Sequence, residues 1–382
     1  MNLQALILQK RIVLTMGPGG VGKTTLSALW GLQAAVSGRK ALVLTIDPAM
    51  RLADALGLSD LAPGEYRELT LAELARWGIA ARAPLHVGML HTGKCLTSLM
   101  EREVPAPARD KILAHPFFQR LCTDLAGSRE YAAMEELHHL HLRGGFDVLV
   151  VDTPPSVQAL DFLEAPDRVL DVLEVQGLGW LRGPALKLGR MGLRLIPSYG
   201  DAVLRTLKKF TGLDFLREMA TFIELFADHL EGFRQRASEV RSILHSPMCA
   251  FVLVSSADEH QLDECAGLFR QVSALGISPA SILVNRLVLP PKPLPSRDAA
   301  VLLTEELERC FPAQREQVHR AVRAMEQAHR ALGHLAARDA ERVEAFEARM
   351  GLPLPVARVG LQPQDVHDLA GLEALRRAVF DG

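Results

Sequence analysis

The chain has few of the residues on which several protein classes depend. Only five of its 382 residues are cysteines, and no two of them form a CxxC pair. This pattern argues against a disulfide scaffold, and it predicts neither a zinc site nor an iron–sulfur cluster. Buried free thiols are the simpler interpretation of Cys95, Cys122, Cys249, Cys265 and Cys310.

Long hydrophobic runs and an excess of charge are also absent from the sequence. The apolar stretches, such as 41–44 and 148–151, are strand-sized and far shorter than the roughly 18 to 20 residues that span a bilayer. The N-terminus lacks the features of a secretion signal, so we expect a cytoplasmic protein. The net charge of -2 supplies no positive field for nucleic acid, and we expect no nucleic-acid partner.

Short apolar runs rich in β-branched residues recur along the chain, with helix-length segments between them. They lie at 12–16, 41–46, 146–151, 250–255, 281–284 and 355–359. Continuous apolarity is typical of strands that are covered on both faces. The pattern therefore predicts an α/β fold with a mostly parallel sheet flanked by helices, in a single domain over residues 1–382.

The longest intervals between these runs indicate added helical material. Residues 162–245 have helical spacing and few strand signals, which predicts a helical insertion on the sheet. Residues 290–295 are proline-rich and predict a stiff, extended connector. Apolar residues at helical spacing over 318–346 predict a long amphipathic helix or a helical hairpin, with Gly333 as a candidate break.

Residues 17–25 carry the strongest chemical signal. They read GPGGVGKTT and match GxxxxGK[ST] between a predicted strand and an apolar helix. The glycines let the backbone wrap a phosphate, and the following helix turns its positive end toward the same anion. Lys23 adds a charge on the β and γ phosphates, and Thr24 offers a hydroxyl to Mg²⁺. The predicted nucleotide contacts are Gly17, Gly19, Gly20, Val21, Gly22, Lys23, Thr24 and Thr25.

A second acidic element lies at the end of the third apolar run. Four apolar residues, 148–151, precede Asp152. In P-loop nucleoside triphosphatases this carboxylate holds the Mg²⁺ shell, and the loop after it senses the γ-phosphate. We therefore predict that Asp152 contributes to a magnesium site, directly or through water. A turn-forming aspartate is the alternative.

Four ordered motifs make the sequence similar to a known family. They are GPGGVGKTT, DPAMRLADAL at 47–56, DTPPSVQALDFLEAP at 152–166 and ILVNR at 282–286. Together they resemble the ArsA-type ATPases of the deviant-Walker P-loop class, which include arsenite-pump ATPases and targeting factors for tail-anchored membrane proteins. The resemblance extends from residue 12 to about residue 377.

The resemblance implies roles for several residues. Asp47 is expected to orient the attacking water, as a catalytic residue beside Lys23, and Asp54 to belong to the same switch segment. Asn285 is expected to hydrogen-bond the adenine edge, since its amide offers both a donor and an acceptor, and a turn cap is the alternative. The loop at 361–363 is expected to pack near the base through Pro363.

The sequence also departs from the family pattern. Pro18 stands where the signature lysine of the deviant-Walker class follows the first loop glycine, and Met50 replaces a common switch histidine. Arg51 is a candidate replacement cation, with a solvated surface arginine as the alternative. The metalloid-binding cysteines of arsenite ATPases are missing, so arsenite-stimulated activity is not expected.

The resemblance implies an ATP-hydrolysing switch with ATP and Mg²⁺ as cofactors. We expect a homodimer, or a heterodimer with a paralogue, in which hydrolysis moves the helical insertion in protein targeting or transport. A MinD- or ParA-like positioning ATPase is the alternative, although no short basic amphipathic tail ends the chain. A ligase-type or reductase-type P-loop enzyme is a third candidate, although the missing cluster cysteines argue against a nitrogenase-reductase-like form and nothing singles out a small second substrate.

Residues 178–209 combine apolar and basic side chains. Seven of their residues are basic and one, Asp201, is acidic. An amphipathic helix packed on the core is one interpretation. The other is a surface that contacts a hydrophobic polypeptide client or an anionic membrane in one nucleotide state.

Overall fold

An eight-stranded sheet lies at the centre of the computed structural model, which describes residues 3–381 except 48–49, 59–60, 124–126, 175–217, 219–220, 294–298 and 352–353. The strand order is β3-β4-β2-β5-β1-β6-β7-β8, and every neighbouring pair is parallel except β3 and β4. The predicted α/β fold with a mostly parallel sheet is therefore confirmed. The strands are β1 (Ile12–Met16), β2 (Ala41–Thr45), β3 (Tyr66–Leu69), β4 (Leu85–Met89), β5 (Val148–Asp152), β6 (Cys249–Ser256), β7 (Ser281–Leu287) and β8 (Val356–Gly360).

Two of these strands were not predicted from the sequence. The edge strand β3 has only Leu69 buried, and its neighbour β4 is interrupted by His86 and Gly88. Neither segment therefore has the continuous apolarity by which buried parallel strands are identified. Both lie in the long interval between the second and third predicted runs, which holds strands as well as the expected helices.

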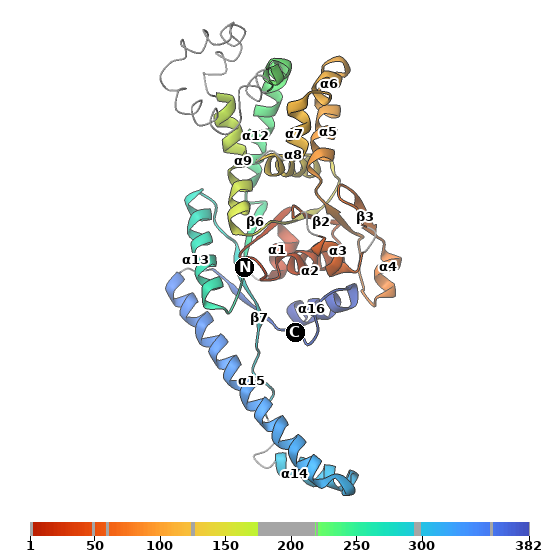
Figure 1. The fold of residues 1–382 in the computed structure, drawn as a ribbon, viewed down its shortest axis with the longest axis vertical. Helices are drawn as coiled ribbons and strands as arrows, with labels where there is room; N and C mark the ends of the chain where they lie inside the picture. Colours follow the sequence, from red (N-terminus) through yellow and green to blue (C-terminus); the bar gives the residue numbers. More distant parts are fainter. Residues whose placement is uncertain are drawn as a thin grey trace.

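Helices cover both faces of the sheet (Figure 1). Alternate residues of β1 enter different hydrophobic clusters, with Ile12 and Leu14 in one and Val13 in the other. The Val13 cluster is completed by α1 (Leu3–Gln9), α2 (Lys23–Val36), α3 (Arg51–Leu56), α4 (Leu71–Arg76) and α16 (Leu369–Phe380). The opposite cluster includes residues of α5 (Thr92–Glu103), α8 (Ser128–Arg143), α9 (Ser156–Glu174), α12 (Leu230–Leu244) and α13 (Glu259–Ala274).

A helical region extends from one end of the sheet (Figure 1). It contains α5, α6 (Ala106–Leu113), α7 (Pro116–Thr123), α8, α9, the short η2 (Ala227–His229) and α12. The helix α8, which precedes the expected insertion at 162–245, packs against α9 and α12, which lie largely or wholly inside it. The segment 178–209, for which a client or membrane contact was predicted, lies outside the described residues.

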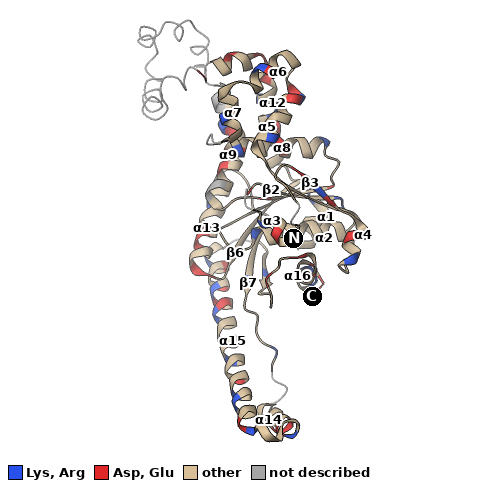
Figure 2. Ribbon diagram, turned by 45° about the vertical axis from the view of Figure 1, so that its right-hand side comes forward, with Lys and Arg blue, Asp and Glu red and all other residues tan. Residues whose placement is uncertain are grey.

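A helical hairpin extends in the opposite direction (Figures 1 and 2). It consists of α14 (Ala299–Cys310), η3 (Pro312–Gln314) and α15 (Arg315–Met350). The 36-residue α15 continues through Gly333 without a break. Its C-terminal half contacts the body, where Asp339 Oδ2 accepts a hydrogen bond from the Val288 amide over 3.1 Å. Among the described residues, no helix has the length and apolarity needed to cross a membrane.

Candidate nucleotide-binding site

The P-loop connects β1 to α2, and its backbone requires glycine at two positions. Gly22 has φ 91°, and a Cβ atom there would lie 2.4 Å from Asn285 Nδ2. At Gly17, with φ 154°, a Cβ atom would lie 2.0 Å from the Val254 carbonyl oxygen. A side chain at either position would displace the strand ends behind the loop, so the close packing explains why glycine is needed.

Lys23 is held inside the curve of the loop. Its Nζ atom donates hydrogen bonds to the carbonyl oxygens of Gly17 at 3.0 Å and Pro18 at 2.7 Å. Burial lowers the pKa of Lys23, while the nearby Asp152 carboxylate opposes that shift. The ammonium group therefore lies where the motif predicts that a phosphate binds.

Asp152 is buried behind the loop at the end of β5. Its Oδ2 atom accepts hydrogen bonds from Thr24 Oγ1 at 2.8 Å and Thr45 Oγ1 at 2.9 Å. Burial raises the pKa of Asp152 to about 6, and the two threonine hydrogen bonds act against that rise. Hydroxyl and carboxylate oxygens in contact fit Mg²⁺, which keeps several waters and takes only one or two protein ligands. Thr24 and Asp152 are thus the residues that would hold the ion, the latter directly or through water.

No larger metal site accompanies this pair. Within the described residues, no group of three or more His, Cys, Asp or Glu side chains comes together as a metal site.

Asp47 and Arg51 stand at the mouth of the site. The Asp47 amide donates to Thr45 Oγ1 at 3.2 Å, which places the residue directly beyond β2. Arg51, the first residue of α3, has its Nη1 atom 3.4 Å from Asp47 Oδ2. The arginine side chain is 62% exposed and the aspartate side chain 16%.

A cavity of about 340 Å³ unites these groups. The predicted residues Gly20, Gly22, Lys23, Thr24, Thr25 and Asp47 line it, together with Arg51, Asp54, Ala55, Thr153, Pro155, Arg286, Val366 and His367. Gly17, Gly19, Val21, Asp152, Asn285 and Pro363 are not among its lining residues. The tertiary structure thus brings most of the predicted phosphate and switch residues together, while the two predicted base contacts, Asn285 and Pro363, do not line the cavity.

Two adjacent residues of β7 reach the P-loop. Asn285 Nδ2 donates to the Val21 carbonyl oxygen at 2.8 Å, and Arg286 Nη1 donates to the Gly20 carbonyl oxygen at 3.0 Å. In the described part of the chain, Arg286 is the one non-glycine residue with a positive φ, at 60°. Sequence analysis missed Arg286, His367 and the supporting Thr45. The sequence offered a signal for each: Arg286 follows Asn285, His367 lies close to the 361–363 loop, and Thr45 comes shortly before Asp47.

Comparison with known proteins decides the family. The profile of the anion-transporting ATPases matches residues 10–299, well over half of the chain. The chain belongs to this family. It is thus a P-loop ATPase by family, and the predicted resemblance is confirmed.

Individual relatives of this ATPase are distant. A protein of Aquifex aeolicus described as an arsenical pump-driving ATPase is 23% identical over 73% of this chain and 63% of its own length. The ATPase GET3 of Malassezia globosa is 26% identical over 76% of this chain and 77% of its own length. A further arsenical pump-driving ATPase, from Prosthecochloris vibrioformis, is 23% identical over 73% of this chain and 61% of its own length. The chain therefore spans less than two thirds of the two pump-driving relatives.

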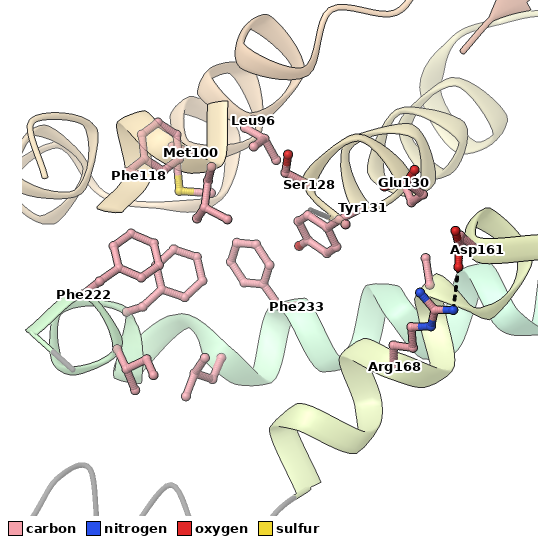
Figure 3. Close-up of a pocket in the computed structure, with 16 residues that line it drawn as sticks. Leu96, Met100, Phe118, Ser128, Glu130, Tyr131, Asp161, Arg168, Phe222 and Phe233 are labelled. Carbon is pink, nitrogen blue, oxygen red and sulfur yellow. Dashed lines mark hydrogen bonds and ion pairs between the residues drawn. The ribbon is translucent and has the colours of Figure 1, made fainter. Parts of the chain in front are cut away.

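The ATPase has a second, larger cavity in its helical region. It measures about 750 Å³ and lies between α5, α7, α8, α9 and α12 (Figure 3). Most of its lining is aromatic or aliphatic, including Phe118, Phe222 and Phe226. Asp161, Ala165 and Arg168 of α9 also line it, and Arg168 Nη2 donates to Asp161 Oδ1 at 2.6 Å. A cavity of this size and apolarity can hold several apolar side chains.

Proposed function

We propose that this ATPase is a nucleotide-dependent switch that couples hydrolysis of ATP to movement of its helical client-binding region. It acts in protein targeting or transport, as a homodimer or as a heterodimer with a paralogue. It is cytoplasmic and contacts a membrane transiently. ATP and Mg²⁺ are its cofactors.

Each part of the nucleotide site has a role in this proposal. Lys23 and the amides of the P-loop bind the phosphates, and Thr24 with Asp152 holds Mg²⁺, which neutralises charge on the phosphates. Asp47 orients the attacking water from the switch segment. Asn285 and Pro363 contact the adenine. Asn285 Nδ2 donates to the Val21 carbonyl oxygen, so the side-chain oxygen of Asn285 remains as the acceptor for the adenine amino group.

The observation that carries the coupling is the course of α9. This helix begins at Ser156, directly after the segment 153–155 that follows β5, and its later residues Asp161, Ala165 and Arg168 line the apolar cavity. Ser156 Oγ donates to Glu264 Oε1 of α13 at 2.8 Å, which fixes the start of the helix. Loops that sense a γ-phosphate shift on hydrolysis, so a shift of Thr153 would be transmitted along α9 to the cavity.

The chemistry of the cavity favours a hydrophobic polypeptide as client. Its aromatic and aliphatic lining resembles the grooves that accept an apolar helix face. The Asp161–Arg168 ion pair also lines the cavity and is partly exposed, so a polar flank of the client could bind there beside the apolar lining. The same proposal includes two further points. Residues 162–245 form a client-binding insertion in the ATPase domain, and residues 178–209 contact the client.

The experiment measures binding of an apolar, uncharged helical peptide of about 20 residues, the length of a membrane-spanning helix. Its affinity is compared between the Asp47→Asn chain with ATP and the wild-type chain with ADP. Coupling requires that the two affinities differ, and that the peptide changes the ratio of ATP affinity to ADP affinity by the same factor. Equal affinities in the two states would contradict the proposal.

Matched variants locate the binding. Ile223→Asp and Leu121→Asp place a charge on partly buried cavity positions and are expected to weaken the peptide at least about tenfold. Leu71→Asp adds the same charge at an exposed leucine of α4 and is expected to leave binding unchanged. Thermal melts of all three chains show whether the fold is retained.

A further inference from the structure

We infer that Arg51 supplies the cation that stabilises the γ-phosphoryl group during hydrolysis, and that it does so in the chain whose own P-loop holds the nucleotide. This inference rests on the proposed ATPase function. It adds a catalytic residue on α3, outside the P-loop motif.

The position of Arg51 is the first argument. It lines the same cavity as Lys23 and Thr24. Its Nη1 atom lies 3.4 Å from the carboxylate of Asp47, the residue proposed to orient the water. The guanidinium group thus lies in the nucleotide cavity beside the residue proposed to orient the water.

The freedom of the guanidinium group is the second argument. Lys23 already donates to two P-loop carbonyls, and Arg286 Nη1 donates to the Gly20 carbonyl oxygen. Among the described residues, Arg51 contacts only Asp47, through a single nitrogen, and most of its side chain is exposed. A single ion pair whose arginine is mostly exposed contributes little stability, so rearrangement of Arg51 toward a phosphate costs little. Four further N–H donors remain for phosphate oxygens.

The chemistry of the reaction is the third argument. Water adds to the γ phosphorus while the bond to the bridging oxygen of the β-phosphate breaks, and ADP, inorganic phosphate and a proton leave. Negative charge spreads over the transferring group, and P-loop enzymes place an arginine there from the same chain or from a partner. Pro18 has no side-chain donor and no backbone N–H to offer at the start of the loop. Arg51 is the cation near the attack side that can meet this charge.

The electrostatics of the site agree with this geometry. Burial is the main cause of the lowered pKa of Lys23, and the positive charge of Arg51 contributes to the same shift. Lys23 and Arg51 are therefore close enough for their charges to interact within one cavity. A triphosphate would bring them together by neutralising their repulsion.

The first test compares kcat with nucleotide affinity. Arg51→Ala is expected to lower kcat by about 10³ or more, the usual worth of such an arginine, while the Kd for ATP changes only a few-fold. Arg51→Lys retains part of the rate because the charge remains. Arg76→Ala, which removes a surface arginine from the short helix α4, is expected to hydrolyse ATP like the wild type. An unchanged kcat in Arg51→Ala, or a loss confined to Kd, would overturn the inference.

The second test separates action within one chain from action across a dimer. Arg51→Ala is mixed with Lys23→Ala, so that a partner could lend its arginine to an intact P-loop. No recovery of ATPase activity is expected, and recovery would overturn assignment to the same chain. Failure of the proposed function looks different, because then the wild-type chain itself would not hydrolyse ATP.

Discussion

Asn285 at the end of β7 donates a hydrogen bond to the Val21 carbonyl oxygen, which ties the P-loop to a strand 264 residues away in sequence. The Nδ2 atom of the same side chain occupies the space beside Gly22. The loop conformation and the proposed base contact therefore depend on one amide.

Removing that amide should affect base recognition. Asn285→Ala is expected to lower the affinity for ATP by about tenfold, which corresponds to the loss of about one hydrogen bond. The affinity for GTP is expected to fall less. Calorimetric titration of both nucleotides measures the ratio. Equal losses for ATP and GTP would show that Asn285 acts on the loop through Val21 and not on the base.

Gly22→Ala should distort the P-loop without removing any donor. Its φ of 91° and the 2.4 Å approach to Asn285 Nδ2 leave no room for a methyl group. Backbone strain of this kind costs about 1 to 3 kcal/mol, so nucleotide affinity is expected to fall by about fivefold to about 150-fold. Gly19→Ala is the comparison, because nothing lies within 4 Å of its added Cβ atom. Similar losses in both variants would contradict the steric explanation.

Lys23→Ala and Asp47→Asn should fail at different steps. Lys23→Ala removes the buried ammonium of the loop and is expected to abolish measurable nucleotide binding. Asp47→Asn leaves the phosphate cradle intact and is expected to bind ATP while hydrolysis slows by orders of magnitude. Binding and single-turnover assays distinguish the two. A wild-type rate in Asp47→Asn would remove Asp47 from the mechanism.

Arg236 should stabilise the helical region through a buried ion pair. Its Nε atom donates to Glu135 Oε2 at 2.8 Å, and its Nη1 atom donates to Glu103 Oε2 at 3.1 Å. Arg236→Met leaves Glu135 buried without its partner and is expected to lower the free energy of unfolding by about 3 to 5 kcal/mol. Urea titration measures the loss. The double variant with Glu135→Gln should recover part of it, and a double variant that is no more stable than Arg236→Met would argue against the pair as the cause.

Local sequence was enough to predict the centre of the fold and the phosphate site. β1, β2, β5, β6 and β7 are apolar runs that are almost wholly buried, so composition identifies them. The run at 355–359 also predicted the edge strand β8, although only Val359 of that strand is buried. The P-loop is a contiguous motif, and its glycines, lysine and threonine bind phosphate within one short segment. It can therefore be identified without reference to distant residues. Thr24 and Asp152 were predicted separately, and their side chains lie 2.8 Å apart because β5 pairs beside β1 in parallel register.

Other features depended on residues far apart in sequence. The partly exposed β3 and the interrupted β4 became strands only because the edge of the sheet gives their backbones hydrogen-bond partners. Arg286 adopts a positive φ that no composition signals, and this turn directs it to Gly20. The apolar cavity gathers side chains from 96 to 233, which no periodicity within one helix can reveal.

The sequence by itself determined the fold class, the family and the phosphate-binding loop, because strand apolarity and the P-loop are properties of neighbouring residues. Only the tertiary structure decided that Asp47 pairs with Arg51 at the cavity, and that α9 leads from the end of β5 to the apolar cavity. Distances between side chains on different elements are set by packing and sheet register, which a single sequence does not contain.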